Sequence, residues 1–140
     1  AFPDVIKFVE GTYRVEREKA HRASAGLSMG GFLSLFISIN NPDTFDYVGL
    51  FSAAVDQQQK GGLDEIYAKR DQKIDNLFAK HPKLFWIGIG KSDFLYKNNA
   101  DLRHYLDSKN FKYEYLETEG GHIWRNWRIY LSEFVPKLFK

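Results

Sequence analysis

Seven consecutive apolar residues in the second half of the chain constrain its fold most. The run covers residues 84–90, LFWIGIG, and contains no charged side chain. A strand with one face in water alternates apolar and polar residues, whereas a strand covered on both faces reads as a continuous apolar run. The run therefore predicts a strand inside a parallel sheet that has helices on both faces.

Strand-like and helix-like segments alternate along the rest of the chain. Further strands are predicted at residues 21–27, 47–52 and 112–118. The clearest helix follows the first of them, because its apolar residues recur at i, i+3, i+4 and i+7. This alternation predicts an α/β fold, a parallel sheet flanked by helices, in one domain over residues 1–140. Asp4 is predicted to cap a first helix. The other helices are marked by Phe32, Leu35, Phe36 and Ile39, by Leu63 to Phe78, by Leu102 to Leu106, and by Trp124 to Leu138. Pro136 is expected to kink or fray the last turn of the final helix.

Composition excludes several classes of function. The net charge is +2, with 20 basic and 18 acidic residues interspersed, so no basic stripe for nucleic acid is present. No apolar stretch approaches the roughly 20 residues of a membrane-spanning helix, and we expect no membrane partner. The absence of cysteine excludes disulfides and a cysteine nucleophile.

A serine flanked by glycines stands where the first predicted strand meets its helix. The sequence is Gly26-Leu27-Ser28-Met29-Gly30-Gly31, a match to G-x-S-x-G. At such a turn Ser28 would be exposed as a nucleophile, and the N–H of Met29 at the helix start would face a developing oxyanion. Gly26 and Gly30 would leave space for the turn. The alternative is that Ser28 is an ordinary helix cap.

Two more polar residues follow later strands of the predicted sheet. The carboxyl ends of parallel strands share one edge, so the loops 28–31, 53–62, 91–98 and 119–124 should meet there. Asp93 and His122 lie in two of these loops, 65 and 29 residues further along in turn, in the order Ser, Asp, His of α/β-hydrolases. His122 would act as the base and Asp93 would orient it. Alternatively, Asp93 forms a turn and His122 occupies a flexible one.

The remaining candidates are weaker. His21, His81 and His104 lie outside these loops, and Glu114, Glu117 and Glu119, which rival Asp93, are more typical of solvated edge charges. No histidine pair has metal-ligand spacing, so we expect no metal and no cofactor. Phe94 and Trp124 stand beside the acid and the base and would line a pocket for a sugar or aromatic ring, or else belong to the core. Trp127 is predicted to be a core residue.

Four motifs, in order along the chain, carry a family resemblance. They are Ala25 to Phe32, Asn41-Pro42-Asp43, Gly90 to Tyr96, and Glu119 to Trp124 with Trp127-Arg128. With them the chain resembles the esterase branch of the α/β-hydrolase superfamily that holds carbohydrate esterase family 1, feruloyl esterases, acetyl xylan esterases and enterochelin esterase. The resemblance implies a serine esterase that acts on feruloyl or acetyl groups of plant polysaccharide, an acylated carbohydrate, and it favours a secreted or periplasmic location.

The resemblance also implies that part of the fold lies elsewhere. Members of this family carry further strands before the segment matched here, and a loop among them gives the second oxyanion-hole N–H. We therefore expect the C-terminal portion of an α/β-hydrolase domain, with its exposed sheet edge covered by the N-terminal part of the same enzyme or by another chain. The alternatives are a catalytically silent fragment or a carbohydrate-binding relative that lacks a complete oxyanion hole, and an esterase or thioesterase for a different small substrate.

Overall fold

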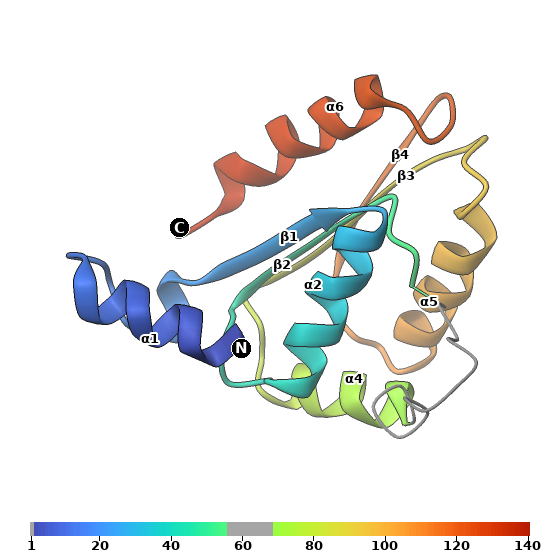
Figure 1. The fold of residues 1–140 in the computed structure, drawn as a ribbon. Helices are drawn as coiled ribbons and strands as arrows, with labels where there is room; N and C mark the ends of the chain where they lie inside the picture. Colours follow the sequence, from blue (N-terminus) through green and yellow to red (C-terminus); the bar gives the residue numbers. More distant parts are fainter. Residues whose placement is uncertain (1, 56–68) are drawn as a thin grey trace, which may run out of the picture.

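Four parallel strands form one sheet in the computed structural model, which describes residues 2–55 and 69–140. The strand order is β1-β2-β3-β4, so that β1 and β4 are the edges of the described sheet (Figure 1). The bounds are Ala23–Leu27 for β1, Tyr47–Phe51 for β2, Leu84–Gly90 for β3 and Glu114–Thr118 for β4. Because each neighbouring pair is parallel, all four carboxyl ends lie at the same edge. The predicted α/β fold with a parallel sheet is confirmed.

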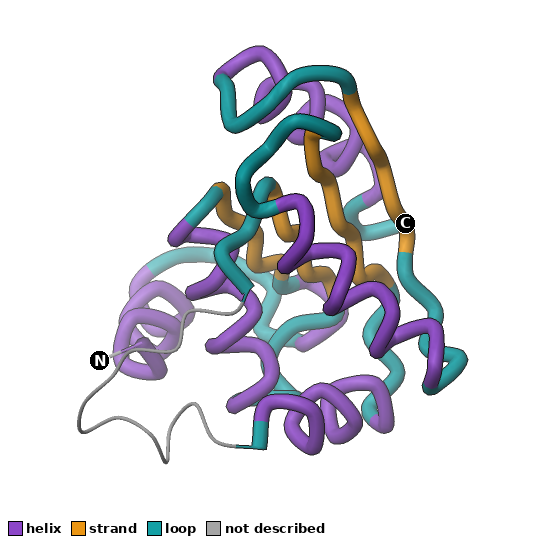
Figure 2. Tube along the Cα trace, turned by 90° about the vertical axis from the view of Figure 1, so that its right-hand side faces the viewer, coloured by secondary structure: helices purple, strands orange, loops and turns teal. Residues whose placement is uncertain are grey.

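Helices cover both faces of the sheet. On one face lie α2 (Met29–Asn40), α4 (Arg70–Ala79) and α5 (Tyr96–Ser108), and on the other lies α6 (Trp124–Phe134) (Figure 1). The side view separates the helix layers from the strands between them (Figure 2). Each face has its own cluster of buried apolar side chains. Strands that follow one another along the chain lie side by side in the sheet.

The strand β3 contributes side chains to both clusters of buried apolar residues. All seven of its residues are buried, as the apolar run predicts. Phe85 and Ile87 belong to the cluster under α2, α4 and α5, whereas Leu84 and Trp86 belong to the cluster under α6. Successive side chains of a strand point to opposite faces, so an unbroken apolar run is what two packed faces require.

Several predicted boundaries shift by a few residues. The first helix, α1 (Phe2–Thr12), begins before Asp4, which therefore lies in its first turn instead of capping it. The first strand starts at Ala23 because Lys19–His21 forms a 3-10 turn. As predicted, α6 ends before Pro136, and Val135–Lys137 is a 3-10 turn. The predicted loop at 56–62 and the start of the predicted helix at Leu63 lie outside the described residues.

The α1 helix is attached to the sheet by few contacts. It has no buried residue, and Val5 and Phe8 on it are 57 % and 62 % exposed. The Arg22 guanidinium pairs with Glu10, and the Phe2 ring lies 5.7 Å from that of Phe45. In the described part of the chain, no helix has both the length and the apolar character needed to cross a membrane.

A tyrosine on α5 is hydrogen-bonded to α4, and this bond makes the stability of the fold depend on pH. The hydroxyl of Tyr105 donates to a carboxylate oxygen of Asp75 at 2.5 Å. Burial, and then this hydrogen bond, raise the pKa of Tyr105 from 10.0 to about 12. Because the pKa is higher in the folded chain, this stabilisation is complete below pH 10 and is lost as pH rises toward 12.

We therefore expect Tyr105→Phe to lower the free energy of unfolding by about 1 kcal/mol at pH 8, and by less at pH 11. Urea titrations at the two pH values measure the difference. Tyr13→Phe, at a position that is 57 % exposed, is the matched control and should change neither value. An equal loss for Tyr105→Phe at both pH values would contradict the assignment.

Candidate active site

Ser28 occupies a strained turn at the carboxyl end of β1. Its backbone has φ 54° and ψ −116°, and its side chain makes no capping hydrogen bond to α2. A positive φ is uncommon outside glycine and costs on the order of 1–3 kcal/mol. Backbone hydrogen bonds hold the turn, since the Ser28 N–H donates to Phe51 and the Ser28 carbonyl accepts from Ala54 and Phe32. The geometry does not match the alternative in which Ser28 is a helix cap.

Glycine is needed before and after this turn, but not at each predicted position. A Cβ on Gly26 would lie 2.2 Å from the carbonyl oxygen of Gly30, and one on Gly31 would lie 2.5 Å from the Ala53 Cβ. Nothing lies within 4 Å of a Cβ built on Gly30. The prediction that Gly30 leaves space for the turn is therefore wrong, and Gly31 has that role because α2 packs directly on the end of β2.

Backbone hydrogen bonds join the loops that follow β3 and β4. The N–H of Lys91 donates to Thr118 at 2.9 Å, and the N–H of Ser92 donates to Gly120 at 3.0 Å. The sheet pairing thus continues for two residues beyond the strands. As a result, Asp93, one residue after Ser92, and His122, two residues after Gly120, are held beside each other.

The structure brings Ser28, His122 and Asp93 together in one chain of hydrogen bonds. His122 Nε2 lies 3.0 Å from Ser28 Oγ, and His122 Nδ1 lies 2.9 Å from Asp93 Oδ2. The carboxylate can only accept, so Nδ1 carries the proton and Nε2 is left to accept from the Ser28 hydroxyl. This is the arrangement in which an imidazole can remove the proton of a serine.

Asp93 is more deeply buried than the histidine to which it is hydrogen-bonded. Its side chain is fully buried, whereas 19 % of the His122 side chain is exposed. The second carboxylate oxygen, Oδ1, accepts from the N–H of Leu95 at 2.9 Å. Both oxygens of the buried carboxylate are thereby hydrogen-bonded, as a buried charge requires.

The rival carboxylates have other partners. Glu114 pairs with Lys137 at 2.8 Å, and Glu119 pairs with Lys91 at 2.5 Å. The hydroxyls of two tyrosines donate to Glu117 and lower its pKa below the ordinary value. None of these three residues contacts His122 among the interactions of the described residues.

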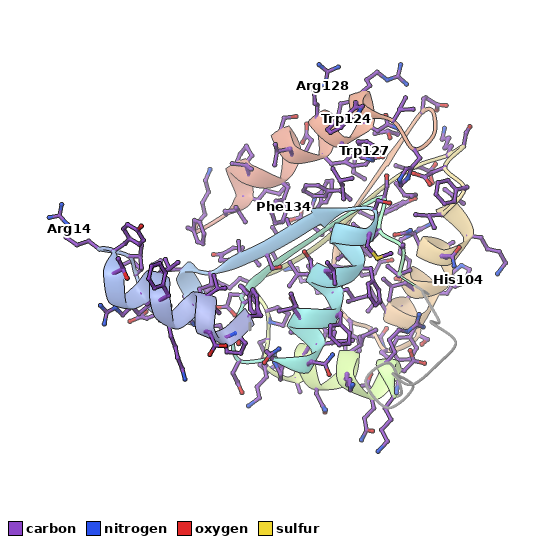
Figure 3. All side chains as sticks on the ribbon, viewed as in Figure 1. Arg14, His104, Trp124, Trp127, Arg128 and Phe134 are labelled. Carbon is purple, nitrogen blue, oxygen red and sulfur yellow. The ribbon has the colours of Figure 1, made fainter. Side chains whose placement is uncertain are left out.

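The other histidines lie away from Ser28. His21 belongs to the 3-10 turn before β1, at the opposite end of the strand, and His81 lies in the turn before β3. Figure 3 places His104 on α5, across the sheet from Trp124 and Trp127. Within residues 2–55 and 69–140, no three His, Asp or Glu side chains are grouped to hold a metal ion.

Aromatic rings form a row through His122. The Phe94 ring lies 4.9 Å from the imidazole, Trp127 lies 5.0 Å from it on another side, and Trp124 lies 5.1 Å from Trp127. Phe94 and Trp124, the predicted pocket residues, are 73 % and 70 % exposed, so neither is a core residue in the described structure. The row gives the site two exposed apolar ends.

A groove of about 270 Å³ lies between α6 and the exposed edge of β1. Figure 3 shows Trp127 directed from α6 toward the sheet and Arg128 directed away from it. The lining is mainly apolar, and its members include Leu27, Phe51, Trp124, Trp127, Arg128 and Leu131. The groove reaches the site through Trp127, whose ring touches both regions.

Two contacts that Trp127 makes at the site were not predicted from the sequence. Trp127, predicted to be a core residue, packs against the α6 cluster but also contacts His122. Its indole N–H donates to the hydroxyl of Ser52 at 3.2 Å. The sequence signals for Trp127 are its place in the motif Glu119 to Trp124 with Trp127-Arg128 and its position about one helical turn after the start of the helix that follows His122.

Comparison with known proteins places the chain in a family. The family model described as "Putative esterase" matches residues 4–138. The chain belongs to this esterase family. An acetyl esterase of Caldicellulosiruptor saccharolyticus is 24 % identical over 156 residues, a match that covers 92 % of this chain and 58 % of that protein. An endo-1,4-beta-xylanase/feruloyl esterase of Xylanibacter ruminicola is 29 % identical over 138 residues, which cover 98 % of this chain and 17 % of that protein.

Solved structures show the same fold. A fluorophosphonate-binding serine hydrolase of Staphylococcus aureus superposes with a TM-score of 0.82 at 21 % identity, over 99 % of this chain and 62 % of that one. The four-stranded sheet is thus part of an α/β-hydrolase fold. The esterase chain spans less than two thirds of the length of either curated relative or of this structure.

The two glycines around Ser28 yield a matched pair of variants. We expect Gly26→Ala to lower the free energy of unfolding by about 3 kcal/mol, because the new methyl group meets backbone that cannot move aside. Gly30→Ala should instead raise it by about 0.5 kcal/mol, since alanine is the better helix former and the space is open. Urea unfolding measures both, and equal effects would contradict the described turn.

Proposed function

We propose that this chain carries the reaction centre of a serine esterase, with Ser28 as nucleophile, His122 as base and Asp93 as the group that orients it. The observation that supports this most is the continuous hydrogen-bond chain from Ser28 Oγ through His122 to Asp93, with distances of 3.0 and 2.9 Å. Membership of the esterase family supports the same reaction class.

Each step uses one of these side chains. Ser28 Oγ attacks the ester carbonyl carbon while His122 Nε2 takes its proton, and the carbonyl oxygen becomes an oxyanion. The N–H of Met29, the first residue of α2, is among the helix N-terminal donors without an intrahelical partner and stabilises that charge. The alcohol then leaves with the proton from His122, and Ser28 holds the acyl group as an ester.

Water completes the cycle by the same route. His122 Nε2 takes a proton from a water molecule, which attacks the acyl-enzyme and releases the carboxylic acid as Ser28 recovers its proton. Asp93 keeps the proton on Nδ1 and balances the positive charge of the imidazolium in each half of the cycle. Its full burial strengthens this interaction because no solvent screens it.

The proposed substrate is a feruloyl or acetyl ester of plant polysaccharide. The names of the two curated relatives, an acetyl esterase and a xylanase/feruloyl esterase, support this class. The exposed rings of Phe94 and Trp124, at the two ends of the aromatic row, offer surfaces for a sugar or a feruloyl ring. Two basic residues lie near the mouth: Lys91 is paired with the carboxylate of Glu119, whereas Arg125 donates to the backbone carbonyl of Glu119, and this pair alone does not point to an anionic substrate.

We expect Ser28→Ala and His122→Ala each to lower hydrolysis of a feruloyl or acetyl ester by about 10⁴-fold or more, because each removes a reacting group. Initial rates with aryl and feruloylated esters measure this. Ser24→Ala, a serine on the same strand outside the site, is the control and should keep the wild-type rate.

Labelling with a fluorophosphonate probe separates the alternatives. Labelling at Ser28 that is lost in Ser28→Ala indicates an activated serine even where feruloyl and acetyl esters are not turned over, and then points to another small ester or thioester. A folded chain that the probe never labels would contradict the esterase proposal and favour a binding role.

The working enzyme, we further propose, covers the free edge of β1 and the groove beside it with additional protein, from the same enzyme or another chain. Among the described residues β1 pairs only with β2, and Leu27 and Leu131 beside the groove are 36 % and 54 % exposed. An unpaired edge strand next to an apolar groove favours association with further strands.

On its own, the chain should therefore bind the dye ANS and self-associate. Leu131→Lys, within the groove, is expected to lower ANS fluorescence at least about twofold, because a charge enters the apolar surface. Ile129→Lys, which is on the same helix at a position 37 % exposed but outside the groove, is the matched control. A monomeric chain without ANS binding in sedimentation and fluorescence measurements would contradict this proposal.

A further inference from the structure

Two rings that differ in burial lie on two sides of the His122 imidazole. Trp127 meets it edge to face, with centroids 5.0 Å apart and planes at 80°, and Phe94 meets it at 4.9 Å and 54°. Phe94 is 73 % exposed, whereas Trp127 is half-buried against the cluster under α6. Only the indole is therefore anchored by surrounding protein.

The anchor of the indole is Ser52, directly after β2. The indole N–H donates to Ser52 Oγ at 3.2 Å, and Ser52 is fully buried. Its backbone has φ 45°, an uncommon value for a serine, and its N–H donates to Gly88 on β3 at 2.8 Å. The hydroxyl that receives the indole is thus attached to the centre of the sheet.

The same segment holds the nucleophile. Phe51 accepts the hydrogen bond from the Ser28 N–H at 2.8 Å, and Ala54 donates to the Ser28 carbonyl at 3.1 Å. Residues 51–54 therefore determine the position of Ser28 through the backbone and the position of Trp127 through the Ser52 side chain. Because Trp127 touches the imidazole, this segment connects the placement of the two reacting groups.

We infer that Trp127 and Ser52 are a pair of positioning residues that hold the His122 imidazole against the Ser28 hydroxyl. The inference rests on the proposed function. It adds a restraint on the orientation of the imidazole, which the hydrogen bonds among Ser28, His122 and Asp93 do not supply by themselves. The bond to Asp93 leaves the ring free to tilt about Nδ1, and the indole blocks that motion on its side. Simple packing would need only the volume of the indole, whereas positioning also needs its N–H.

Four variants separate positioning from packing. Trp127→Phe keeps a ring but removes the N–H, and Ser52→Gly removes the acceptor while glycine accepts the positive φ without strain. The double variant closes a double-mutant cycle. Phe134→Leu is the control, since it alters a buried ring of the same helix and cluster that has no contact with His122 in the described structure.

Two readouts are used, one of which needs no turnover. The first is the rate at which a fluorophosphonate labels Ser28 under each variant. The second is the low-field proton NMR resonance of His122 Nδ1–H, assigned with ¹⁵N-labelled histidine, which reports whether the imidazole stays ordered on Asp93. Melting temperatures identify any variant that loses its fold.

We expect Trp127→Phe and Ser52→Gly each to label about tenfold more slowly, because a small displacement of the base is costly. The double variant should be no slower than Trp127→Phe, since both changes break one interaction. The Nδ1–H resonance should broaden in these variants and remain sharp in Phe134→Leu. Wild-type labelling rates in both single variants, or independent losses that multiply in the double variant, would overturn the inference.

Failure of the proposed function gives a different pattern. If the wild-type chain folds but is never labelled, the esterase proposal fails and the NMR resonance alone decides the inference. Broadening confined to Trp127→Phe, Ser52→Gly and the double variant then still supports the positioning role. An unchanged resonance in all four variants overturns it.

Discussion

The hydrogen bonds between the end of β2 and the serine turn are the interactions on which the site depends. Ser28 has φ 54°, a conformation that an isolated chain would rarely adopt. The N–H and the carbonyl of Ser28 are each bonded to residues 51–54, and Gly26 leaves room for α2 to begin at once. Because two strands and a helix determine this turn together, its strain persists in the folded chain, and the Ser28 hydroxyl lies at the sheet edge within hydrogen-bond distance of His122.

Burial of Asp93 determines the chemistry of the histidine. A fully buried carboxylate needs a donor for each oxygen, and here Leu95 supplies one and His122 Nδ1 supplies the other. The buried charge thereby selects the imidazole tautomer that leaves Nε2 free to accept from Ser28. The folding requirement of one acidic side chain and the proposed role of the base are thus met by the same hydrogen bond.

Much of this arrangement is predictable from sequence because it follows from periodicity and topology. The apolar run at β3 predicts a strand with two covered faces, and the parallel order predicts that the loops carrying Ser28, Asp93 and His122 share an edge. Those are properties of whole segments, which local residue patterns record.

Other features depend on contacts between distant residues and leave no local pattern. Gly30 and Gly31 are indistinguishable in sequence, yet only Gly31 faces Ala53 across the interface of α2 and β2. Trp127 is spaced as a core residue, and its contact with His122 depends on how α6 crosses the sheet. Ser52 marks the end of β2 in sequence, but its bond to an indole 75 residues away requires the tertiary fold.

The two faces of the sheet differ in how completely they are covered, and this difference matters for the proposed reaction. The face under α2, α4 and α5 has a closed apolar cluster, whereas the α6 face has an open groove beside β1. In the proposed mechanism, proton transfer needs Ser28, His122 and Asp93, which follow the described strands β1, β4 and β3. In the proposed mechanism a second donor would stabilise the oxyanion together with the Met29 N–H, and loss of one donor typically lowers the rate by about 10²–10³-fold. Under the proposed mechanism, activation of the serine and stabilisation of the oxyanion therefore depend on different groups, so a reactive serine is compatible with slow hydrolysis of esters.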